Sequence, residues 1–240
     1  MQAEVTRTPV NDIRLLLIGE PGFVRSWIAG GELNRLGFCG VVILLGAGSY
    51  GAAMGYWRAP LQGLFVAIKL PLILILTTFG NALLNAMLAP LLGLNISFRQ
   101  TCLAILMSFT IASAILGSFS PLAAFVIWNS PAMTADFHIS GRTYSLIQLT
   151  HVAVIAFAGI VANLRLIQLL RQLSGSIVIA RRVLIGWLAG NLFLGSQLSW
   201  ILRPFIGAPN LPIEFLRASA FQGNFYESLF HSLARVLNVN

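Results

Sequence analysis

Acidic residues are scarce in this sequence, and none of them lies in a long apolar run. The seven are Glu4, Asp12, Glu20, Glu32, Asp136, Glu214 and Glu227. Proton-coupled membrane carriers normally bury a carboxylate near the middle of the bilayer, because an ionisable group is costly there and is kept for function. The absence of acids from the apolar runs therefore disfavours a carrier of this kind.

The sequence also lacks the short motifs of several enzyme classes. It contains no HExxH, no GxSxG and no glycine-rich phosphate loop, so nothing points to metalloprotease, serine hydrolase or nucleotide chemistry. A metal site could be drawn from Asp136, His138, His151, Glu227 and His231, but their spacing is generic and their separation along the chain is large. We expect no enzymatic activity, no cofactor and no metal.

Charge of either sign is rare. Charged residues make up 9% of the 240 residues, hydrophobic residues make up 57%, and the mean hydropathy is +0.84. In soluble domains about a quarter of the residues are charged, so this chain has too few charged side chains to form a water-exposed surface. Runs of about 20 apolar residues cross a bilayer, and we place five at Leu36–Tyr56, Ile68–Leu92, Thr101–Trp128, Tyr144–Leu166 and Val183–Leu202. The sequence therefore predicts an all-α fold, a polytopic bundle of about five transmembrane helices in contact with the lipid bilayer.

Three parts are predicted along the chain. Residues 1–35 read as an N-terminal segment of short, partly apolar helical pieces with interleaved arginines, which is typical of interfacial amphipathic helices. Residues 36–202 form the transmembrane bundle. Residues 203–240 begin with prolines that forbid a continuous helix and end in an amphipathic helix capped by Asn224. We expect that last helix to cap the bundle rather than lie on lipid, because its polar face is mixed in charge.

The basic residues beside the spans predict the orientation, because positive residues gather on the cytoplasmic side of short loops. The formal net charge is +8. Nine arginines lie on the side of the N-terminus: Arg7, Arg14, Arg25, Arg35, Arg99, Arg165, Arg171, Arg181 and Arg182. Five lie on the other side: Arg58, Arg142, Arg203, Arg217 and Arg235. This split predicts a cytoplasmic N-terminus and an external C-terminus in a cell membrane, which we take to be a bacterial inner membrane, and we expect no nucleic-acid partner.

Small residues line the first predicted span. Ala47, Gly51 and Gly55 recur every four residues and so share one face of a helix, and the last span has the pair Gly186 and Gly190. Such faces let two helix backbones approach closely in lipid. Packing within the chain is the favoured interpretation, and a homo-oligomer or another membrane protein held through these faces is the alternative.

Four polar residues of the spans are candidates for a functional or structural role. Asn81 and Asn85 lie four residues apart on one face, and His151 lies in the fourth span. Interhelical hydrogen bonds between amides contribute about 1 kcal/mol, and we favour such a structural role for the two asparagines over ligand binding. The fourth candidate is Lys69.

Two interpretations of Lys69 are open. The run 61–93 would form a helix of about 50 Å, longer than the hydrocarbon core of about 30 Å, which favours Lys69 as an interfacial anchor that extends towards water. A buried Lys69 would instead need a partner, and the candidates are Asp136, Glu214 and Glu227. In that case we expect the C-terminal tail to fold over the outer mouth of the bundle and bring Glu214 or Glu227 towards Lys69.

The layout of the chain resembles that of the Yip1-like family. The similarity lies in a proline-containing N-terminal segment, LLLIGEPGFVRSWIAGG, followed by five spans with the N-terminus inside and the C-terminus outside. The aspartate- and tyrosine-bearing motif of eukaryotic members is missing, and GSYGAAMGYW stands where it would be expected. The C-terminal blocks RPFIGAPNLP and GNFYESLF lie outside this layout and look like a signature of bacterial membrane proteins. The resemblance implies an interaction or trafficking-type membrane protein rather than an enzyme.

The sequence thus predicts a non-enzymatic, multi-pass membrane protein that acts as an interaction or membrane-organising component. The alternative is a channel or facilitator with a polar path lined by Lys69, Asn81, Asn85 and His151. A membrane-embedded lipid-modifying enzyme comes third, disfavoured because the spans hold no carboxylate. A water-accessible cavity that reaches the middle of the bundle would favour transport, and a solid bundle would favour the first reading.

Overall fold

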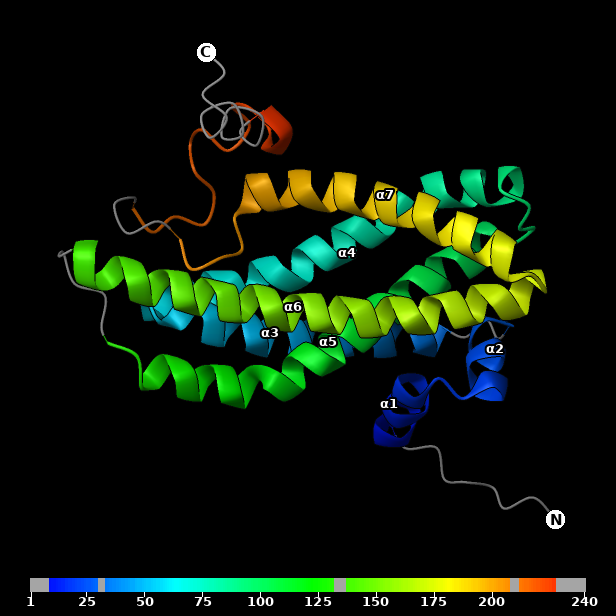
Figure 1. Cartoon of the computed structure of the whole chain (residues 1–240), viewed down its shortest axis with the longest axis horizontal. Helices are drawn as coiled ribbons and strands as arrows, with labels where there is room; N and C mark the ends of the chain where they lie inside the picture. Colours follow the sequence, from blue (N-terminus) through cyan, green and yellow to red (C-terminus); the bar gives the residue numbers. More distant parts are fainter. Residues whose placement is uncertain (1–8, 30–32, 132–136, 208–211, 228–240) are drawn as a thin grey trace.

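The computed structural model describes residues 9–29, 33–131, 137–207 and 212–227, and this part of the chain forms helices and no strand (Figure 1). Two short helices, α1 (Pro9–Ile18) and α2 (Pro21–Ala29), come first. Five long helices follow, and each contains a stretch long and apolar enough to cross a membrane. They are α3 (Leu33–Tyr56), α4 (Pro60–Leu91), α5 (Phe98–Trp128), α6 (Phe137–Ser174) and α7 (Ile177–Leu202). The predicted all-α bundle of five spans is confirmed.

The long helices extend beyond the apolar runs that predict them. α4 begins at Pro60 rather than Ile68, and α7 begins at Ile177 rather than Val183. Proline suits the first turn of a helix because its φ is already helical and its missing N–H would have no partner there. α5 begins at a capping box, in which Ser97 Oγ accepts from Gln100 N at 3.3 Å and Gln100 Oε1 accepts from Ser97 N at 3.0 Å. Hydropathy marks where a helix can meet lipid, whereas these local signals decide where it begins.

The small residues of α3 bring its backbone close to two neighbours. A Cβ at Gly51 would lie 2.7 Å from the carbonyl oxygen of Val66 in α4, and one at Gly55 would lie 2.7 Å from that of Gln62. On the α5 side, a Cβ at Gly117 would lie 2.9 Å from Cα of Gly46. The glycine face of α3 is therefore packed within the chain, against α4 and α5, as the favoured interpretation predicts.

The helices differ in how much of their surface the bundle covers. The apolar stretch of α5 is 61% buried, whereas those of α6 and α7 are 22% and 17% buried. α5 therefore forms the centre, in contact with α3, α4 and α6, while α7 packs along α4 and α6. The exposed faces of α6 and α7 carry large apolar side chains such as Leu149, Phe157 and Leu192. These faces meet the lipid of the bilayer.

The N-terminal helices are docked on the bundle. Leu16, Val24, Trp27 and Ile28 are buried and belong to its apolar core, and α1 and α2 contact α5, with α2 also contacting α6. These four side chains therefore pack against the bundle, while Val10 and Ile18 of α1 stay exposed.

Two arginines secure the C-terminal ends of these helices. Arg165 Nε of α6 donates to the carbonyl of Leu17 at 2.9 Å. Arg35 Nη1 donates to the carbonyls of Ser26 and Trp27, and its guanidinium lies over the Trp27 ring. Carbonyls at the end of a helix lack intrahelical donors, so both arginines satisfy groups that would otherwise need water.

The C-terminal segment, which we define as residues 203–207 and 212–227, folds back on the bundle at the end opposite to α1 and α2 (Figure 1). The N–H of Phe225 donates to Gln197 Oε1 at 3.4 Å, and the Tyr226 hydroxyl donates to the carbonyl of Phe193 at 3.3 Å. Asn224 Oδ1 accepts from the N–H of Glu227 at 2.8 Å, so the predicted cap is present. The rest of the predicted terminal helix lies outside the described residues.

Candidate functional site

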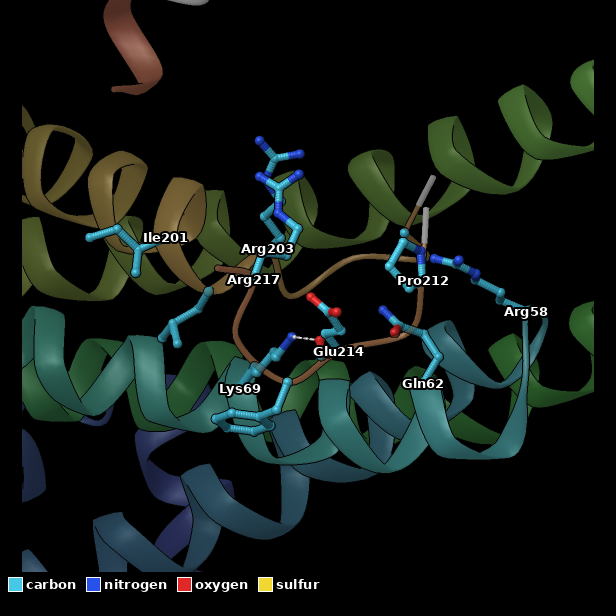
Figure 2. A pocket seen from close by; sticks show the side chains of 11 residues that line it. Arg58, Gln62, Lys69, Ile201, Arg203, Pro212, Glu214 and Arg217 are labelled. Carbon is cyan, nitrogen blue, oxygen red and sulfur yellow. Dashed lines mark hydrogen bonds between the residues drawn. The ribbon is translucent and has the colours of Figure 1, made fainter. Parts of the chain in front are cut away.

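A pocket lies where the first turns of α4, the end of α7 and the C-terminal segment meet (Figure 2). Its cavity has a volume of about 50 Å³. Four cationic side chains line it, together with one carboxylate and one amide: Arg58, Lys69, Arg203 and Arg217, with Glu214 and Gln62. The other lining residues are apolar or glycine. We call this site the basic pocket.

Lys69 forms the floor of the basic pocket and is 3% exposed. Its Nζ donates to the backbone carbonyl of Glu214 at 3.3 Å, and it lies 5.7 Å and 5.1 Å from the ring centres of Phe65 and Phe215. These two rings meet edge to face. A cation is attracted to the electron-rich face of an aromatic ring, so Lys69 is held by two rings and one carbonyl.

The surroundings of Lys69 contradict the anchor interpretation and agree only in part with the buried one. The anchor interpretation is wrong, because the helix begins well before Lys69 and the C-terminal segment covers the side chain. The tail does fold over Lys69 and brings Glu214 to it, but through the main chain. The Glu214 carboxylate is exposed and forms no ion pair with any residue that the structure describes. Glu227 bonds to Asn224 instead and does not line the pocket, and Asp136 lies outside the described residues.

The loop that closes the pocket depends on Gly207. Its φ is +84°, a backbone conformation open to glycine, and a Cβ there would collide with a guanidinium nitrogen of Arg58. Next to it, Gln62 Nε2 donates to the carbonyl of Phe205 at 2.7 Å. A buried amide of α4 thus fixes the first part of the C-terminal segment over the cavity.

Arg203 and Arg217 contribute buried donors without acceptors. Arg203 ends α7 in the left-handed conformation, with φ of 45°, and its guanidinium lies 4.6 Å from the Trp200 ring centre. The Nε atoms of Arg203 and Arg217 are both buried and have no hydrogen-bond partner in the described part of the chain. Burial and the nearby charge of Arg217 lower the pKa of Arg203, and burial also lowers the pKa of Arg58. Arg203 and Arg217 therefore bring positive charge and unsatisfied donors to the pocket.

The asparagines of α4 lie elsewhere, in the interface with α7. Asn81 Nδ2 donates to Asn191 Oδ1 at 2.8 Å, and Trp187 Nε1 donates to the carbonyl of Asn85 at 3.3 Å. Both asparagines are fully buried, and Gly190 of α7 lies directly over them, since a Cβ there would be 3.1 Å from Asn81 Oδ1. The Asn81 amide thus joins α4 to α7, whereas neither amide atom of Asn85 has a hydrogen-bond partner in the described part of the chain.

His151 of α6 faces α3. Its Nδ1 lies 2.8 Å from the hydroxyl of Tyr50, and the two rings meet edge to face with centres 5.4 Å apart. His151 is 5% exposed and Tyr50 is fully buried. The four polar candidates therefore have three different surroundings: the C-terminal segment for Lys69, α7 for the asparagines and α3 for His151.

Sequence reasoning missed most of the basic pocket. Arg58, Arg203 and Arg217 counted only as charges that orient the chain, and Gln62 was not considered. One signal was present: two of these arginines fall in the short proline-rich stretch whose fold over Lys69 was one of the hypotheses. Their meeting could not be predicted without the path of the chain from 203 to 217.

Comparison of the chain with protein-family models, with curated proteins and with solved structures finds no significant match. The Yip1-like resemblance stays a prediction, and the site must be interpreted from its own chemistry.

Proposed function

We propose that this multi-pass membrane protein is a non-enzymatic interaction or membrane-organising component that acts through its C-terminal segment. The observation that carries the proposal is the surface of this segment. Phe205, Leu216, Phe221 and Tyr226 of this segment expose between 37% and 76% of their area. Exposed apolar groups rimmed by polar ones mark sites that bind protein or membrane.

The interior of the bundle supports this role over that of a facilitator. Asn81 and Asn85 lie in the contact between α4 and α7, and His151 is bonded to α3. Glycines hold α3 against α4 and α5 at backbone contact. The bonds of Asn81 and His151 join helices, and the two lie in different interfaces, α4 with α7 and α3 with α6, which supports a packed bundle over one shared polar path.

We also propose that the protein lies in a bacterial inner membrane with its N-terminus in the cytoplasm. The support is that Arg14, Arg25, Arg99, Arg181 and Arg182 belong to α1, α2 or the adjoining ends of α5 and α7, where the positive-inside rule expects cytoplasmic charges. The C-terminal segment would then act outside. The Yip1-like resemblance fits an interaction role of this kind.

Photo-cross-linking in native membranes tests the interaction role. A photoreactive residue at Phe221, which is 76% exposed, should give discrete protein adducts. The matched control is Leu149, a lipid-facing residue of α6 that is 64% exposed, and it should label lipid. If the two positions give the same lipid-only pattern, an interaction role for this surface is wrong.

One observation favours the facilitator as a second candidate: the basic pocket could attract anions to an end of the bundle. Anion flux into liposomes that contain the purified protein distinguishes the two. We expect chloride and phosphate flux at the level of protein-free liposomes. A flux that Lys69→Met abolishes would replace the interaction role by transport.

A further inference from the structure

We propose that the basic pocket binds a phosphate group, supplied either by a lipid headgroup or by a free phosphate compound. The binding site goes beyond the interaction role and does not depend on it, because a ligand could occupy the pocket whatever partner meets the surrounding surface.

The first support is the imbalance of charge. Lys69, Arg203 and Arg217 line a cavity of about 50 Å³, and Glu214 carries the one carboxylate that lines it in the part of the chain that the structure describes. That carboxylate is exposed and makes no ion pair within the described part of the chain, so it does not act as the internal counter-ion. Lys69 is buried, and so are the Nε atoms of the half-buried Arg203 and Arg217; charged groups withdrawn from water are normally paired, because an unpaired one is costly. A bound anion would supply the missing partner.

The second support is the arrangement of donors. Figure 2 shows the side chains of Arg203 and Arg217 running beside each other on one side of the pocket. Both Nε atoms are buried without an acceptor in the described residues. Two guanidinium groups with like charge repel each other unless an anion lies near both. Each presents a planar fork of N–H donors that matches two oxygens of a phosphate.

The size and place of the cavity specify the ligand further. A site for one water needs about 10–15 Å³, so about 50 Å³ accepts roughly four water-sized groups, the scale of a phosphate head. Lys69 adds a point charge at the floor, which is the usual way lysine contributes to phosphate sites. The pocket also lies beside the first turns of α4 and the last residues of α7, the ends of two stretches that can cross a membrane, so we place it within reach of lipid headgroups.

The test uses the full chain, purified without phosphate in a non-ionic detergent or in nanodiscs of phosphatidylcholine. The probes are inorganic phosphate and phosphatidic acid, and the readouts are the ligand-dependent rise in melting temperature and bound lipid counted by native mass spectrometry. The pocket variant carries Arg203→Gln and Arg217→Gln. The matched control carries Arg181→Gln and Arg182→Gln, the same change in charge on two exposed residues at the other end of α7.

We expect the pocket variant to bind at least about tenfold more weakly, a loss of about 1.4 kcal/mol, because it removes hydrogen bonds from charged donors to the phosphate. The control variant should bind as the wild type does. Glu214→Gln should tighten binding, since it removes the one negative charge at the site. Equal binding by the pocket variant and the wild type, or no binding of either probe by the wild type, would overturn the proposal.

Stability without ligand separates a binding role from a structural one. The ligand-free pocket variant should melt no lower than the wild type, because the changes remove mutual repulsion. A clear drop in its melting temperature would mean that both arginines already have partners in the fold, and would overturn the proposal. Binding of phosphatidic acid alone identifies a lipid headgroup, binding of inorganic phosphate alone identifies a soluble ligand, and competition between them identifies the phosphate group that both share.

Discussion

The ammonium group of Lys69 is buried, and in the part of the chain that the structure describes it makes no ion pair. Two aromatic rings and one carbonyl hold it instead. Cation–π contacts contribute about 0.5–2 kcal/mol, which partly offsets the cost of burial and the repulsion from the neighbouring arginines. The residue is therefore suited to a ligand that brings negative charge, and is close to neutral for stability without one.

Lys69→Met should change the free energy of unfolding by less than about 1 kcal/mol, because the lost hydrogen bond and ring contacts are balanced by relief of a buried cation. Glu214→Gln in the same background should be additive within about 0.5 kcal/mol, since the carboxylate is not the partner of Lys69. Thermal or denaturant unfolding in detergent measures both. A loss above about 3 kcal/mol for the single variant would indicate a paired carboxylate.

Tyr50→Phe should destabilise the protein by about 1–2 kcal/mol, because it leaves Nδ1 of His151 without its hydrogen-bond partner inside the bundle. Tyr226→Phe is the matched control: its hydroxyl also bonds, to the carbonyl of Phe193, but on an exposed side chain. That change should stay within about 0.5 kcal/mol. Equal effects of the two changes on the melting temperature would show that the buried hydrogen bond between α3 and α6 stabilises the protein no more than the exposed one does.

At the scale of elements, α3 acts as the helix against which α4 and α5 are placed. Its contacts are between backbones, at Gly51 and Gly55 towards α4 and at Gly46 towards α5. In lipid there is little hydrophobic drive between helices, so van der Waals packing at close range must hold them. Added side-chain atoms on this face would push the helices apart, and the same addition elsewhere on α3 would not.

Gly51→Ala and Gly40→Ala test this difference within one helix. A Cβ at Gly51 would lie 2.7 Å from the oxygen of Val66, whereas nothing lies within 4 Å of one at Gly40. Gly51→Ala should cost about 1–3 kcal/mol through overpacking. Gly40→Ala should be neutral or stabilising by up to about 1 kcal/mol, because alanine favours the helix. Similar melting temperatures for the two variants would contradict the close packing of α3 and α4.

At the scale of the molecule, five spans place the two terminal segments at opposite ends of the bundle (Figure 1). The N-terminal helices close one end through Leu16, Trp27 and Ile28, and the C-terminal segment covers the other around Lys69. Single cysteines report which end faces which side. Ser174 at the C-terminal end of α6 and Ala218 in the exposed C-terminal segment suit this purpose, in a background without Cys39 and Cys102.

We expect a membrane-impermeant thiol reagent to label Ala218→Cys from outside intact cells. Ser174→Cys should react only after the membrane is opened, because one span, α7, lies between the two positions. Labelling of both from the same side would contradict the five-span arrangement. The reverse pattern would keep the arrangement and overturn the proposed orientation.

The sequence alone is enough to identify the class of fold. A chain with 9% charged residues and five long apolar runs must form a membrane-embedded helical bundle, since only lipid can cover so much apolar surface and only helices satisfy their own backbone there. The spacing of Ala47, Gly51 and Gly55 likewise determines a face for close contact, because helical period is a local property. These features depend on composition and on neighbours a few residues apart.

Only the tertiary structure decided which helix meets that face and which charges meet one another. Lys69 and Glu214 touch although they stand far apart along the chain, and Arg203 and Arg217 join them because the C-terminal segment turns back over α4. The sequence offered Asp136, Glu214 and Glu227 as candidates and favoured the two in the C-terminal tail, and it suggested a carboxylate where the contact is the backbone carbonyl of Glu214. Pairings of this kind depend on the path of a segment rich in proline and glycine, whose turns no helical or strand period describes.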